Sequence, residues 1–180
     1  HRVIAHELGH ILGMGHTGVT QCSGAAWGAI PYRNNTNAYY GDATCGSRTY
    51  ADWLGFMGLG GSSFISHSGA VAKEAWGWLS DAEDAPHYID QVEESGFYAL
   101  KSISRAELTG TKALKLQHGP NQFMYVEYRT TTNLDGSPTI DQSVAESSFY
   151  NRSDIFSGAL LRVGGGHSMW RKSLLFDAYA

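Results

Sequence analysis

The chain has 180 residues and a formal net charge of −4, with 42% hydrophobic and 12% aromatic residues. This composition indicates packed cores, in one large or two small domains, and not a disordered chain. The mildly acidic balance lacks the basic patch that nucleic-acid binding needs, and no apolar run reaches the roughly 18 residues of a membrane span.

The first predicted element is a helix that carries a zinc-enzyme signature. Five residues, His6, Glu7, His10, Gly13 and His16, spell H-E-x-x-H-x-x-G-x-x-H. On a helix, His6 and His10 lie about 40° and one turn apart, so both can reach one ion. Gly13 accepts the positive φ of a helix-ending turn, which lets His16 return as a third ligand. The pattern predicts a Zn²⁺ site with a fourth position open to water.

Glu7, next to the first ligand, is the candidate general base. Zinc lowers the pKa of its bound water to about 7, and Glu7 takes the proton as this water attacks a carbonyl. The same carboxyl then returns the proton to the leaving amine. The expected reaction is therefore the hydrolysis of peptide bonds.

Residues 17–49 are predicted to be a long ordered loop, because glycine, asparagine, threonine and tyrosine occur there without a sustained period. The segment contains the two cysteines of the chain, Cys22 and Cys45. Neither has zinc-ligand spacing to another cysteine, so we do not expect a structural zinc site here.

The segment Tyr50–Gly58, with Met57 near its end, completes a resemblance to a known family. A long zinc signature followed by a methionine turn is typical of the metzincin metallopeptidases. The stretch Lys73–Leu79, with the sequence KEAWGWL, is similar to the segment after that turn in the gametolysin family. The resemblance implies that Met57 lies beneath the three imidazoles. Without the upstream signature, Met57 would be read as an ordinary core methionine.

The family implies a secreted zinc endopeptidase that acts on extracellular, matrix or cell-wall glycoproteins. In an extracellular chain, Cys22 and Cys45 would be joined by a disulfide that closes a loop of about two dozen residues. Two free thiols are the alternative.

Residues 67–79 are predicted to form a helix that closes the catalytic unit. His67, at its start, has two interpretations. It either points into the cleft, where an imidazole would stabilise an oxyanion, or lies on the surface, which is the more common place for a histidine.

Beyond an acidic connector at residues 81–86, alternating or β-branched runs predict short strands. The runs are at residues 87–91, 97–103, 112–117, 123–129, 157–163 and 173–177. A small antiparallel β-sandwich is predicted, similar to the β-rich region that follows the catalytic domain in the gametolysin family. The expected fold class is α+β, with residues 1–85 as the C-terminal part of a metallopeptidase catalytic domain and residues 86–180 as an accessory domain.

Metzincins place a twisted sheet before the active-site helix, and an extended substrate binds along its edge strand. We therefore expect the chain to be a fragment that lacks the N-terminal half of the catalytic domain. Its nearly all-apolar helix would then expose a large apolar surface, and the fragment alone would have weak activity or none.

Two other functions compete with this interpretation. One is a catalytically inactive metzincin relative used for binding or matrix assembly, although such a protein has no need to keep both Glu7 and an open metal site. The other makes residues 87–180 a carbohydrate-binding module whose aromatic side chains stack on sugars, although core packing is their more common use. The aromatic residues in question are Tyr98, Tyr125, Tyr128, Tyr150 and Trp170.

Overall fold

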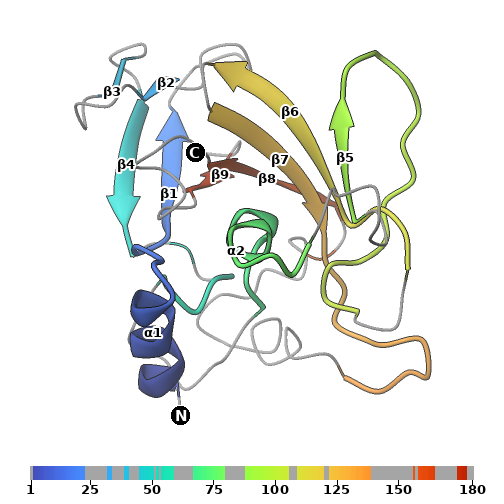
Figure 1. Ribbon diagram of the computed structural model, residues 1–180, viewed down its shortest axis with the longest axis horizontal. Coiled ribbons are helices and arrows are strands. Elements are labelled where there is room, and N and C mark those ends of the chain that lie inside the picture. The colour runs from blue at the N-terminus through green and yellow to red at the C-terminus, as the bar shows by residue number, and fades with distance from the viewer. Residues whose placement is uncertain are drawn as a thin grey trace.

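The computed structural model describes most of the chain in thirteen stretches. They are residues 2–22, 32–33, 39–40, 45–50, 52, 54–58, 67–79, 88–105, 109–119, 122–138, 156, 158–164 and 174–177. Two helices and nine strands lie within them (Figure 1): α1 (Arg2–Ile11), β1 (Gly18–Cys22), β2 (Tyr32–Arg33), β3 (Tyr39–Tyr40), β4 (Cys45–Thr49), α2 (Ala70–Ala75), β5 (Ile89–Val92), β6 (Ala113–Gly119), β7 (Gln122–Tyr128), β8 (Ala159–Gly164) and β9 (Leu174–Asp177). The predicted α+β class is confirmed.

The described strands form a seven-stranded sheet in the order β4-β1-β9-β8-β7-β6-β5, and β2 and β3 form a separate pair. The pairs β1–β9 and β5–β6 are parallel and the others antiparallel. The antiparallel sandwich predicted over residues 86–180 is not confirmed, because the strands described there share one mixed sheet with β1 and β4. The domain boundary predicted at residues 85–86 lies outside the described residues.

The predicted loop over residues 17–49 contains a strand pair at its two ends. β1 and β4 pair antiparallel from Gly18 opposite Thr49 to Cys22 opposite Cys45. Both strands are short and β1 has a neighbour from the far end of the chain, β9, so local periodicity gave no sign of them. Conversely, the strand predicted at residues 97–103 is irregular in the structure, and Phe97 is fully exposed.

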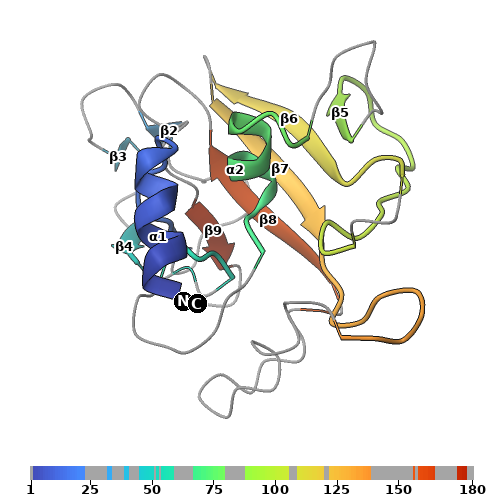
Figure 2. The same ribbon diagram turned by 60° about the horizontal axis from the view of Figure 1, so that its bottom comes forward.

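α2 lies against one face of the sheet, over β7 and β8 (Figure 2). Its residues Ala70 and Val71 are buried and pack in a core with Ile103, Ala113 and Tyr125. The helix predicted over residues 67–79 is shorter than expected, because the chain turns at Gly77 with φ of +71°. The packing fixes the chain on both sides of α2 relative to the sheet.

α1 lies beyond the ends of β1 and β4 (Figure 1). Its apolar residues Val3, Ile4, Leu8 and Ile11 are exposed, as is Leu12 directly after it, and Ile11 is 80% exposed. The expected apolar surface on this helix is therefore present. No helix in the described part of the chain is long and apolar enough to cross a membrane.

Candidate metal centre

Three histidines from α1 and the turn after it converge on one point. α1 presents His6 and His10 on one side, and the chain leaves the helix at Gly13, whose φ is +87°. His16 returns so that one ring nitrogen from each histidine lies within 4.8 Å of the others. Within the described residues, this is the group whose donors are close enough together to hold a metal ion.

Backbone carbonyls orient two of the rings. His6 Nδ1 donates to the carbonyl of Phe56 at 3.0 Å, and His10 Nδ1 donates to the carbonyl of Met14 at 2.9 Å. A carbonyl only accepts, so each Nδ1 carries a proton, and in the neutral imidazole Nε2 then keeps its lone pair. Metal-binding histidines commonly donate such a hydrogen bond from the ring nitrogen that does not bind the metal. In His6 and His10 the nitrogen that would bind the metal is then Nε2.

The spacing of two Nε2 atoms fits a small tetrahedral ion. His10 Nε2 and His16 Nε2 are 3.1 Å apart, and both residues are partly buried. Two nitrogens bound to zinc at 2.0–2.1 Å with tetrahedral angles would lie about 3.3 Å apart. The donor set and its geometry are therefore suited to Zn²⁺.

Met57 lies under the helix that carries the first two histidines. It is buried, and it packs with Met14 and Ala72. A Cβ at Gly9 would overlap Met57 Sδ, so the thioether lies directly against the helix backbone between His6 and His10. The carbonyl of Met57 also accepts from the amide of Thr17 at 3.0 Å.

Tyr50 lies against the histidine group, and no role was predicted for it from the sequence. Its ring centroid lies 3.9 Å from that of His16 and 6.4 Å from that of His6. Among the described residues, Tyr50 is the non-glycine residue with a positive φ, at 66°. Such backbone strain is concentrated at functional sites. No local sequence pattern predicts this contact, because it depends on where Tyr50 lies relative to the turn that carries His16.

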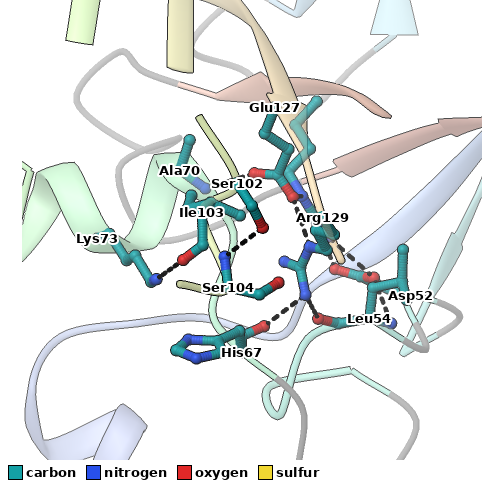
Figure 3. Close-up of polar contacts among 11 residues, drawn as sticks. Asp52, Leu54, His67, Ala70, Lys73, Ser102, Ile103, Ser104, Glu127 and Arg129 are labelled. Carbon is teal, nitrogen blue, oxygen red and sulfur yellow. Dashed lines mark hydrogen bonds and ion pairs between the residues drawn. The ribbon is translucent and has the colours of Figure 1, made fainter. Parts of the chain in front are cut away.

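A buried network of four charged side chains contacts Leu54, at the start of the loop that carries Met57. Figure 3 shows three of the four, Asp52, Glu127 and Arg129, around Leu54. Asp52, Glu127, Arg129 and Arg162 are each fully buried. Arg162 donates to Asp52 Oδ2 at 2.6 Å and to Glu127 Oε1 at 2.9 Å, and Arg129 donates to Glu127 Oε1 at 3.0 Å. Sequence reasoning missed this network, because its members are up to 110 residues apart.

The network shifts the pKa values of Glu127 and Arg162. Burial alone would raise the pKa of Glu127, but Arg162, Arg129 and the amide of Ala70 outweigh it and lower the pKa to about 2. Burial alone would lower the pKa of Arg162, but Asp52 and Glu127 raise it. The opposite charges therefore keep Glu127 and Arg162 ionised in the interior.

The remaining candidate residues have different positions. Glu7 is exposed on α1, one residue after His6. His67 is partly buried, and its carbonyl accepts from Arg129 Nη1 at 3.0 Å (Figure 3). It is not part of the histidine group, and its role at an oxyanion stays a prediction. The backbones of Cys22 and Cys45 lie directly opposite one another in the β1–β4 pair.

Comparison with protein-family models, with curated proteins and with solved structures finds no match to this chain.

Proposed function

We propose that the chain belongs to a zinc-dependent endopeptidase and holds its metal ligands and general base. The observation that carries the proposal is the convergence of His6, His10 and His16, with two of the Nδ1 atoms held by carbonyls. Three neutral imidazoles that leave a fourth position open are the donor set of a catalytic zinc site.

When bound, Zn²⁺ supplies a Lewis acid that lowers the pKa of a water molecule into the neutral range and polarises a carbonyl. The chain supplies the proton transfers. Glu7 follows His6 directly on α1 and is exposed, so its carboxylate is open to both water and substrate. It accepts the proton of the attacking water and returns it to the amine of the cleaved peptide bond.

The resemblance to the gametolysin family supports a secreted enzyme with extracellular or cell-wall proteins as substrates. The opposed positions of Cys22 and Cys45 fit an oxidising compartment. The exposed apolar face of α1 fits the proposal that an N-terminal half of the catalytic domain covers this helix and provides the substrate-binding edge strand.

A catalytically inactive binding protein is the competing function, and one substitution separates the two. Glu7→Gln keeps the shape of the side chain but removes its basicity. In the full-length protein, we expect this variant to retain one zinc per chain and to lose roughly 100- to 10,000-fold in cleavage of a quenched peptide library. Zinc uptake without any cleavage by the unmodified protein would favour the binding function.

A further inference from the structure

We infer that strands β7 and β8 position the metal centre. Their buried charged network fixes the loop Leu54–Gly58, and this loop in turn orients His6 and supports α1. The inference rests on the proposed metal site. It makes Asp52, Arg129 and Arg162 positioning residues, and it gives part of the region predicted as an accessory domain a role in the enzyme.

The sheet holds Leu54, at the start of the loop, through both its amide and its carbonyl. Arg162, on β8, donates from Nη1 to Asp52 Oδ2 at 2.6 Å. Asp52 Oδ1 in turn accepts from the amide of Leu54 at 3.0 Å. Arg129, directly after β7, donates to the carbonyl of Leu54 at 2.9 Å. Neither the amide nor the carbonyl of Leu54 can therefore move without breaking a charge-assisted hydrogen bond.

The other end of the loop contacts the metal centre at three places. The carbonyl of Phe56 accepts from His6 Nδ1, which sets the ring orientation. The carbonyl of Met57 accepts from the amide of Thr17, the residue after His16. The side chain of Met57 lies against Gly9 in α1. A shift of the loop would consequently move both the ring of His6 and the chain next to His16.

The network has little room to rearrange. A Cβ at Gly69 would come within 2.9 Å of Arg162 Cζ, and a Cβ at Gly55 would come within 2.8 Å of Asp52 Oδ2. Glu127 Oε2 also accepts from the amide of Ala70 at 2.6 Å, which ties α2 to the same centre. Because every member is buried and shared, a change at one residue leaves the charge of another uncompensated.

A second buried ion pair provides a matched control. Lys115 on β6 and Glu74 on α2 are 2.5 Å apart, and both side chains are 9% exposed. This pair links the same helix to the same sheet. Glu74 also accepts from the hydroxyl of Tyr125 on β7, so both contacts of this carboxylate lie between α2 and the sheet. A loss of metal affinity that comes only from weaker folding would therefore follow from breaking either pair.

The test compares Arg162→Lys with Lys115→Met in the full chain. Lysine keeps the charge but cannot bridge two carboxylates as the guanidinium does. The readouts are zinc affinity by chelator competition and the visible spectrum of the Co²⁺-loaded protein, at a temperature where melting curves show both variants folded. We expect Arg162→Lys to lose roughly 10- to 100-fold in affinity, the usual effect of changing a group that orients a ligand, and to shift the Co²⁺ bands. Lys115→Met should keep both properties.

Equal losses in the two variants, or unchanged zinc affinity in Arg162→Lys, would overturn the inference. If Arg162→Lys does not fold, Asp52→Asn replaces it, because the amide oxygen still accepts from Leu54 while the pairing with Arg162 weakens. The same spectral shift is then expected, and its absence also counts against the inference. Failure of the proposed function would look different: the unmodified protein would bind no zinc, or His10→Ala would bind it equally well.

Discussion

Gly9 lies directly on the side chain of Met57. A Cβ at this position would overlap Sδ and come within 2.9 Å of Phe56 Cε2. The residue between His6 and His10 at this point of α1 is therefore a glycine, because Met57 and Phe56 touch the helix backbone there.

Gly9→Ala should consequently weaken the metal centre. Alanine favours a helix over glycine by about 1 kcal/mol, but here the methyl group must push Met57 and Phe56 away, which costs about 1–3 kcal/mol in packed interiors. We expect a lower melting temperature and weaker zinc binding. Gly158→Ala is the control, since no atom lies within 4 Å of a Cβ there. A more stable Gly9→Ala variant would show that the contact does not exist.

Tyr50 offers a test in which stability and metal affinity change in different directions. Tyr50→Gly relieves a left-handed backbone conformation that costs roughly 1–2 kcal/mol, but it removes the ring that lies against His16. We expect unchanged or higher stability in denaturant unfolding together with weaker zinc binding. Tyr50→Phe keeps the ring and should keep the affinity. If Tyr50→Gly binds zinc as well as the unmodified protein, the ring does not position His16.

The charged network predicts how stability depends on pH. The pKa of Glu127 is about 2 in the folded protein, below its ordinary value near 4.5, because the positive charges of Arg162 and Arg129 outweigh burial. The stabilisation is present in full above pH 4.5 and is lost as the pH falls from about 4.5 toward 2. The difference of about 2.5 pKa units corresponds to about 3 kcal/mol in total, at 1.36 kcal/mol per pKa unit.

The metal-free protein should be used for this measurement, so that release of zinc from the histidines does not contribute. Urea unfolding at pH 6, 4 and 3 gives the free energy of unfolding directly. Glu127→Gln should be less stable than the unmodified protein at pH 6, and the difference should shrink toward pH 3. A difference that stays constant with pH would mean that Glu127 does not titrate in this way.

The pairing of β1 with β4 makes a disulfide testable. Opposite residues of an antiparallel pair have Cα atoms about 4.5–5.5 Å apart, which suits a disulfide, and Cys22 lies opposite Cys45. In protein produced under oxidising conditions, we expect a mass 2 Da below that of the reduced chain, and reduction should cost about 3 kcal/mol of stability. Cys22→Ser should respond to reductant with no change in stability. Two alkylatable thiols in the untreated protein would exclude the bond.

The parts of the site that could be predicted from the sequence are those in which neighbours in the chain are neighbours in space. His6, His10 and His16 come together because one helix and one turn determine their positions. The strands β6, β7 and β8 were likewise predicted from local alternation, close to their observed bounds.

Long-range contacts account for what was missed. Arg162 looked like one residue of an outlying strand, yet it pairs with Asp52, which is 110 residues earlier. β1 lies between β4 and β9, so its place in the sheet depends on a segment about 150 residues later, and no local pattern encodes it. A buried charge can be recognised as part of a site only when its partners are known.

X-ray absorption of the zinc-loaded chain is the most direct test of the proposed metal centre. Three imidazole nitrogens at about 2.0–2.1 Å and one further light-atom ligand are expected, and His10→Ala should remove one of the imidazole contributions. A protein that takes up no zinc, or zinc with fewer than three histidine ligands, would contradict the proposal.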